Sequence, residues 1–179
     1  GGIGTFSTES VPALEHYRLV YATPNVVQIS PYYVHTPSSW VKIFERVPGA
    51  TITGTAPPNT SISAIVAMHV PTTNSTFHYA QHTTSDSSGK FTMTVPYSTI
   101  GYDELGPENG YTNVDVRAAG PYYITTEFQT HEGTIHVPDS SVNGLGPELT
   151  IDLKENFWEL CNCVWDDSIG IIKPKENTP

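Results

Sequence analysis

The chain has 179 residues, enough for one domain with an apolar core, and we expect one domain with irregular ends. Eighteen acidic residues against eight basic ones give a formal net charge of −10, which argues against nucleic acid as a partner because phosphates would be repelled. Charged residues make up only 15% of the chain, and its wealth of Ser, Thr, Gly, Pro and Tyr favours a turn-rich β protein over a helical one.

The first part, residues 1–39, is predicted to be a connector with an ordered beginning. Pro12–Tyr21 could form a short helix or a strand, and the prolines at 24, 31 and 37 divide the rest of the connector into extended pieces. The start lacks the features of a signal peptide, and no apolar run is long enough for a transmembrane helix. We therefore expect a soluble piece of a longer protein.

From residue 40 the pattern becomes β, because short stretches of β-branched and aromatic residues alternate with turn residues. The candidate strands, of which we expect seven or eight to form, are 40–45, 50–55, 61–70, 77–81, 90–97, 112–118, 122–129, 133–137 and 149–153. Asp86–Gly89 predicts a hairpin-type turn, and 98–110 predicts a long polar loop. Phe91, Met93 and Val95 lie two apart and should point into the core.

This spacing predicts a mainly β fold, an antiparallel β-sandwich of seven or eight strands over residues 40–155. Residues 156–179 depart from the pattern and are predicted to be an appendage or a disordered tail. Cys161 and Cys163 are too close for an unstrained disulfide and too few for a closed zinc site, so we expect them to be unpaired and without function.

Seven histidines invite a metal interpretation, and one pair has suitable spacing. His78 and His82 would share a face of a strand, so a metal pair is geometrically possible, although exposed strand histidines are commoner than ligands. His131–Gly133 resembles half of a metalloprotease motif, but the second His at helical spacing is missing. We expect this segment to be a loop before a strand.

Acidic residues in the long loop could hold a weak surface cation, but solvated loop acids are the commoner case. The candidates are Asp103, Glu104, Glu108, Asp115 and the amide of Asn109. No strained serine elbow and no glycine-rich phosphate cradle occur in the sequence. We therefore assign no catalytic, cofactor-binding or metal-binding residue in this chain, and we expect no cofactor in it.

Two sequons, Asn59-Thr60-Ser61 and Asn74-Ser75-Thr76, lie on predicted turns. Such positions suit N-glycosylation on the outside of a cell. Sequons also arise by chance in a chain rich in Ser and Thr, so each is a weak signal by itself.

Four blocks in order resemble one family: Val11–Val20, Trp40–Ala50, Phe91–Thr99 and Gly110–Val114. They are similar to the C-terminal region of archaeal glycosylation protein B from halophilic archaea, the single-subunit dolichyl-phosphooligosaccharide–protein glycotransferase. The resemblance covers about residues 1–153. It implies that residues 1 to about 25 end the extracellular core of such an enzyme and that 40–153 form a peripheral β domain.

The resemblance also implies what lies outside this chain. The family's Trp-Trp-Asp-x-Gly acceptor motif is absent, because Trp158 and Trp165 stand apart. The divalent metal, Mn²⁺ or Mg²⁺, is expected only for the full enzyme. The implied partners are the catalytic core and membrane part of the same enzyme, with the lipid-linked glycan and the acceptor protein reached only through them. The implied location is the extracellular face of the archaeal membrane, and the implied role is to brace the core.

Two alternatives remain open from sequence. An adhesin-like surface module would have the same composition and the same sequons. A carbohydrate-binding module could use aromatic faces, for which the candidates are Tyr32, Tyr33, Trp40, Tyr122 and Tyr123. Aromatics at alternate strand positions more often lie in the core.

Overall fold

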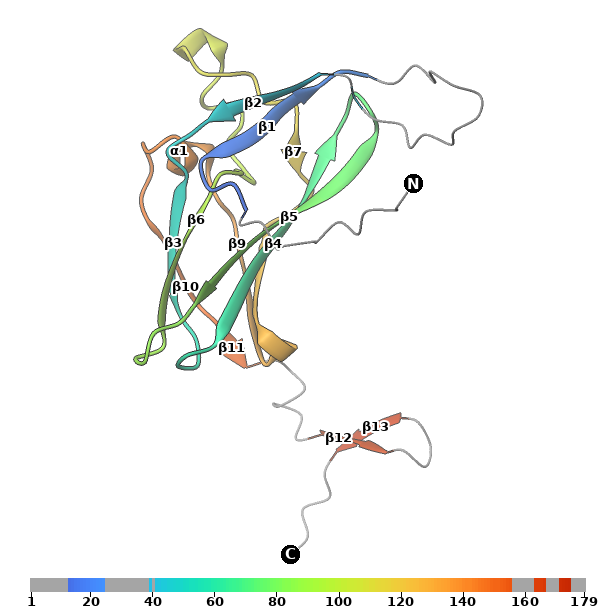
Figure 1. The fold of residues 1–179 in the computed structure, drawn as a ribbon, viewed down its shortest axis with the longest axis vertical. Coiled ribbons are helices and arrows are strands. Elements are labelled where there is room, and N and C mark those ends of the chain that lie inside the picture. Colours follow the sequence, from blue (N-terminus) through green and yellow to red (C-terminus); the bar gives the residue numbers. More distant parts are fainter. Residues whose placement is uncertain (1–12, 25–38, 40, 156–162, 167–170, 175–179) are drawn as a thin grey trace, which may run out of the picture.

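The structure is a computed structural model that describes residues 13–24, 39, 41–155, 163–166 and 171–174, and its fold is almost entirely β (Figure 1). None of the described helices is long and apolar enough to cross a membrane. The strands are β1 (Tyr17–Ala22), β2 (Lys42–Arg46), β3 (Ala50–Thr55), β4 (Ser61–Val70), β5 (Ser75–Thr84), β6 (Lys90–Val95), β7 (Arg117–Ala118), β8 (Tyr122–Thr126), β9 (His131–Ile135), β10 (Leu149–Asp152), β11 (Lys154–Glu155), β12 (Cys163–Asp166) and β13 (Ile171–Pro174). The helical segments are single turns, η1 (Pro107–Asn109), η2 (Glu127–Gln129) and α1 (Asp139–Val142).

Two of the sheets face each other as a sandwich. One has the order β10-β3-β6, and the other has the order β11-β9-β8-β4-β5, with β7 also pairing with β4. All pairs in the larger sheet are antiparallel. The prediction of a mainly β, antiparallel sandwich is confirmed.

The core lies between these sheets and follows from the alternation of side chains along each strand. On β4 every second residue from Ile62 to Val70 is buried, and on β6 the buried residues are Phe91, Met93 and Val95, as predicted. Tyr122 and Ile124 of β8 are fully buried in the same cluster. The strand pattern in the sequence therefore fixes which faces meet.

One strand pair departs from the antiparallel rule, because β10 runs parallel to β3. The chain reaches β10 from α1, and the N–H of Gly49 donates to the carbonyl of Val142 at 3.0 Å. Both strands therefore start from the same end of the sandwich and run the same way. They approach closely at Gly54, where a Cβ would lie 2.5 Å from the Phe91 ring and closer still to the Ile151 carbonyl oxygen.

Two strand predictions were too long by three residues or more. Of 112–118 only Arg117–Ala118 forms a strand, because the N–H groups of Asp115 and Val116 both donate to the single carbonyl of Val20 in β1 and do not form a ladder with it. The strand predicted over 122–129 ends at Thr126 and continues as η2. There Phe128 and Gln129 have φ values of 65° and 57°, which no strand residue adopts.

The predicted turn at Asp86–Gly89 forms, with the Gly89 N–H donating to the Asp86 carbonyl at 3.0 Å. It does not make a hairpin, since β5 pairs with β4 and β6 pairs with β3. The turn instead carries the chain from one sheet to the other. Alternation alone could not reveal this, because both strands present an apolar face to the same core.

The ambiguous segment Pro12–Tyr21 contains a strand, β1, which pairs with β2 in a separate two-stranded sheet. Arg18 and Leu19 pair with Glu45 and Phe44, and a bulge follows at Val20. That bulge turns the Val20 carbonyl towards residues 115 and 116, which tie it to the sandwich. A strand of the predicted connector thus pairs with the first strand of the predicted sandwich.

The C-terminal part contains one further sheet, in which β12 pairs with β13 antiparallel. The sequence pattern does not predict these strands. Cys161 lies outside the described residues, and only the backbone is described at Cys163. The predictions for the cysteines stay as predictions.

Candidate functional site: a buried ion-pair cluster

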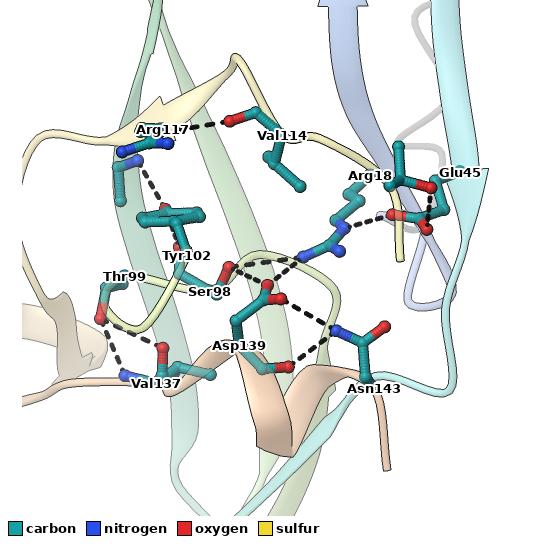
Figure 2. A network of polar contacts seen from close by, with 12 residues as sticks. Arg18, Glu45, Ser98, Thr99, Tyr102, Val114, Arg117, Val137, Asp139 and Asn143 are labelled. Atoms are coloured by element: carbon teal, nitrogen blue, oxygen red, sulfur yellow. Dashed lines mark hydrogen bonds and ion pairs between the residues drawn. The ribbon is translucent and has the colours of Figure 1, made fainter. Parts of the chain in front are cut away.

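The most distinctive polar feature of the described residues is a buried guanidinium between two carboxylates (Figure 2). Arg18, on β1, is 1% exposed. Its Nη1 donates to Asp139 Oδ1 at 2.5 Å, and its Nε donates to Glu45 Oε2 at 2.8 Å. We call Arg18, Glu45, Ser98 and Asp139 the Arg18 cluster.

Asp139 opens α1 and is 1% exposed. Besides Arg18 it accepts from Ser98 Oγ at 2.7 Å and, at Oδ2, from Asn143 Nδ2 at 3.0 Å. Each carboxylate oxygen therefore has a donor. Burial of a charge is tolerated under these conditions, because the hydrogen bonds replace lost water.

Glu45 completes the cluster at its solvent side, with 20% of its side chain exposed. Its second oxygen accepts from Thr112 Oγ1 at 2.6 Å. The cluster thus ties β1 and β2 to the loop before β7 and to α1. The bonds that Arg18 donates to Glu45, Ser98 and Asp139 span 27, 80 and 121 positions of the sequence.

Buried tyrosines add to the same joint. Tyr97 Oη accepts from the Leu19 N–H at 2.9 Å, and Tyr102 Oη accepts from the Ala118 N–H at 2.9 Å while donating to the Ser98 carbonyl. Burial raises the pKa of both hydroxyls above the usual value. They therefore stay protonated at neutral pH and act as fixed hydrogen-bonding groups.

The arrangement does not favour catalysis. A guanidinium does not give up its proton, and both carboxylates are held by donors. Two surface cavities, of about 430 and 370 Å³, lie near β1 and β2, but none of the Arg18 cluster lines either one. The geometry fits a rigid joint between the β1–β2 sheet and the sandwich.

The cavities are instead lined mainly by apolar side chains. Phe44 and Tyr97 line both, Leu19 and Phe77 line the larger, and Tyr17 lines the smaller. In β1, in β2 and just before each of these strands, several apolar side chains are half exposed. We call these the β1–β2 apolar surface, which consists of Leu14, Tyr17, Val41, Ile43 and Phe44, each 43–56% exposed.

The histidine pair considered for a metal shares one face of a strand, as expected, but among the described residues it has no third ligand. His78 and His82 are both exposed on one face of β5, and His82 Nδ1 lies 2.9 Å from Ser63 Oγ. Across the described part of the chain, no group of three His, Cys, Asp or Glu side chains could hold a metal ion. The loop acids are also dispersed, with Asp103 paired to Arg117 at 3.2 Å.

The interpretation of His131–Gly133 as a loop was wrong, because these residues begin β9 and pair with β8. Glu132 pairs opposite Thr125, and the Tyr123 hydroxyl donates to its carboxylate. The strand continues through Gly133 because Ile151 packs against the space that a side chain would fill.

The carbohydrate-binding candidates receive little support from the described residues. Tyr122 is fully buried in the core, and the Tyr123 hydroxyl is bonded to Glu132. Tyr32, Tyr33 and Trp40 lie outside the described residues.

Sequence patterns did not reveal the Arg18 cluster. The available signal was an arginine followed directly by Leu19, Val20 and Tyr21 in a chain with only eight basic residues. Such a residue on an apolar strand needs a carboxylate partner. Nothing local indicates that the partner is Asp139, far along the chain.

Comparison with known proteins identifies the family. The family model of the archaeal glycosylation protein B long peripheral domain matches residues 49–146, more than half of the chain. The chain belongs to this family. The matched segment contains Ser98 and Asp139, whereas Arg18 and Glu45 precede it. The Arg18 cluster therefore joins the archaeal glycosylation protein B peripheral domain to the sheet before it.

Two curated relatives agree. The chain is 50% identical over 144 residues to dolichyl-monophosphooligosaccharide–protein glycotransferase AglB of Haloferax volcanii, covering 70% of this chain and 14% of that protein. It is 42% identical over 117 residues to dolichyl-phosphooligosaccharide–protein glycotransferase 3 of Archaeoglobus fulgidus, covering 65% of this chain and 12% of that protein. The chain thus spans about one eighth to one seventh of these relatives.

Solved structures show the same fold. The archaeal oligosaccharyltransferase AglB from Archaeoglobus fulgidus, in complex with an inhibitory peptide and a dolichol-phosphate, aligns with a TM-score of 0.61 at 22% identity. That alignment covers 81% of this chain and 21% of the other. The apo form of the Archaeoglobus fulgidus oligosaccharyltransferase aligns with a TM-score of 0.60 at 21% identity, covering 79% and 21% of the two chains.

Proposed function

We propose that this peripheral domain braces the catalytic core of a dolichyl-phosphooligosaccharide–protein glycotransferase on the extracellular face of the archaeal membrane. The observation that carries the proposal is the β1–β2 sheet. The Arg18 cluster fixes this sheet to the sandwich, while the five residues of the β1–β2 apolar surface stay half exposed. A rigid sheet with an apolar surface suits a docking element.

The β1 strand is attached to the sandwich at several points. Arg18 and Asp139 are both buried. The Leu19 N–H donates to the Tyr97 hydroxyl, and the Val20 carbonyl accepts from the N–H groups of residues 115 and 116. The Ala22 carbonyl accepts from Thr72 Oγ1. A domain held this way moves with the β1–β2 sheet as one body. Holding that sheet therefore holds the peripheral domain.

The partners follow from the position of the family within longer proteins. The relatives named as glycotransferases extend far beyond the matched part. We infer that the catalytic core and membrane part of the same enzyme cover the β1–β2 apolar surface. The lipid-linked glycan, the acceptor protein and a divalent metal, Mn²⁺ or Mg²⁺, would be bound by those parts and not by this chain.

The proposal is tested by deleting residues 40–153 from the full enzyme. We expect a lower melting temperature with turnover per folded molecule nearly retained, because a brace contributes to stability and not to chemistry. A normal melting temperature together with lost turnover would contradict the brace and indicate a direct role in catalysis.

A further inference from the structure

The turn between β3 and β4 carries one of the two sequons, Asn59-Thr60-Ser61. Asn59 is exposed and has a φ of 54°, the left-handed conformation that asparagine tolerates in turns. Among the described residues its side-chain amide has no hydrogen-bond partner. The amide is therefore free to carry a substituent in the folded protein.

Hydrogen bonds with Ser85 and Asp86 hold the backbone of this turn in place. Ser85, which is 2% exposed, donates through Oγ to the Pro57 carbonyl at 2.6 Å and accepts from the Thr60 N–H at 2.9 Å. The Asn59 N–H donates to the Asp86 carbonyl at 3.2 Å. These bonds hold the turn from the inside and leave the side chain of Asn59 outside.

The surface around Asn59 is polar and open. Asp86, Ser87 and Ser88 of the neighbouring turn are exposed, as is Ser61, the hydroxyl residue of the sequon. A glycan attached here would cover hydrated groups and would not need to displace any packed apolar side chain. The folded domain can therefore accommodate it at little cost.

The second sequon, Asn74-Ser75-Thr76, lies where β4 turns into β5 and offers a contrast. Asn74 follows β4 at its other end, about 30 Å away by the rise of a ten-residue strand. Its turn is joined to β1 by the bond from Thr72 Oγ1 to the Ala22 carbonyl, and Thr73 and Ser75 line the larger apolar cavity. The turn between β3 and β4 lies at the opposite end of the sandwich from the β1–β2 sheet (Figure 1), so a glycan on that turn leaves the β1–β2 apolar surface free.

We propose that the side chain of Asn59 carries an N-linked glycan in the mature protein, transferred from a lipid-phosphate-linked donor. The amide nitrogen forms a bond to C1 of the first sugar and loses one proton. The bond from C1 to the phosphate oxygen breaks, and its electron pair leaves with the lipid phosphate. The inference rests on the proposed function, because the turn must be exposed on the outer side of the membrane.

The test is mass spectrometry of glycopeptides from the full enzyme, purified from the membranes of its source cells. We expect a glycan on the Asn59 peptide, lost entirely in Asn59→Gln and in Ser61→Ala. Thr60→Ala is the matched control and should keep it, since the middle position of a sequon accepts any residue except proline. An unmodified Asn59, in cells whose other sequon proteins are glycosylated, would overturn the inference.

A second measurement shows whether an unmodified Asn59 results from a wrong glycosylation site or from a wrong cellular location. Lys90 is exposed beside the same turn, and a membrane-impermeant amine reagent on intact cells should label it. A labelled Lys90 with a bare Asn59 would overturn the glycosylation and leave the location standing. A Lys90 labelled only after cell lysis would contradict the extracellular location itself.

Discussion

The β1–β2 sheet combines two opposite kinds of residue. Its charged residue Arg18 is almost completely buried and is paired with two carboxylates. Its apolar residues Ile43 and Phe44, at neighbouring positions of β2, are half exposed. Buried charge and exposed apolar surface are both uncommon in a soluble domain, and both occur in one small sheet.

This contrast shows which contacts the chain completes by itself. The Arg18 cluster needs nothing further, since both oxygens of Asp139 and of Glu45 have donors. The β1–β2 apolar surface is incomplete in the described residues, which is why we assign it a partner. Substitutions in the Arg18 cluster should therefore lower the stability of the chain by itself. Substitutions in the β1–β2 apolar surface should lower stability mainly in the full enzyme.

The largest expected effect is at Asp139. Asp139→Ala would leave the guanidinium of Arg18 buried with only Glu45 as a charged partner, and breaking a buried pair in this way costs roughly 3–5 kcal/mol. Chemical denaturation of the chain should show this loss. The double variant Arg18→Met with Asp139→Leu should recover much of it, because both buried charges are then gone.

The matched control is the exposed ion pair between Asp103 and Arg117, whose side chains are 89% and 47% exposed. Asp103→Ala should change the free energy of unfolding by less than about 1 kcal/mol, because exposed pairs contribute little. If Asp103→Ala and Asp139→Ala lowered the free energy of unfolding equally, the buried ion pair would be no more important for stability than an exposed one, contrary to our account.

The next effect is expected in the body of the sandwich. Gly54→Ala would place a Cβ against the Ile151 carbonyl and the Phe91 ring, so β10 or β6 must move. Overpacking of this kind costs roughly 1–3 kcal/mol. A thermal melt of the variant measures it. An unchanged melting temperature would show that β10 does not pack against β3 in the register described.

An effect of similar size, confined to one hydrogen bond, is expected for Tyr97→Phe. The change removes the acceptor for the buried Leu19 N–H and leaves that donor unsatisfied, which costs roughly 1–3 kcal/mol. Hydrogen exchange at Leu19 should become faster. Tyr123→Phe is a useful comparison because its hydroxyl bonds to Glu132, away from this sheet. Exchange at Leu19 should not respond to that variant.

The smallest effect concerns pH at the turn between the sheets. The hydroxyl of Ser88 and the N–H groups of Lys90 and Ser88 bond to Asp86, which lowers the pKa of its carboxyl below 3.8. A lowered folded-state pKa contributes stability above the unfolded value that is lost as pH falls through the folded value. The stability difference between wild type and Asp86→Asn should therefore shrink below about pH 4. A constant difference from about pH 6 to about pH 2.5 would contradict this linkage.

Prediction from sequence succeeded for structure that follows from alternating apolar and polar residues along a strand. It failed for structure that depends on contacts between residues far apart in the sequence. The buried faces of β4 and β6 follow from period-two patterns, and the structure confirms them. Val114 and Val116 are buried as in a strand, yet their segment bonds to Val20, nearly a hundred positions earlier, which no local pattern encodes. The same distance hides the pairing of Arg18 with Asp139.

The central claim is that the β1–β2 apolar surface is covered in the full enzyme, and Ile43→Asp tests it most directly. In the chain alone the loss of stability should be about 1 kcal/mol, because the side chain is already half exposed. In the full enzyme the loss should be several times larger, since a charge would be buried against the core. Phe128→Asp, at an 87% exposed position outside this surface, should have the same small effect in both. If Ile43→Asp also has the same effect in both, the surface is not covered and the account is wrong.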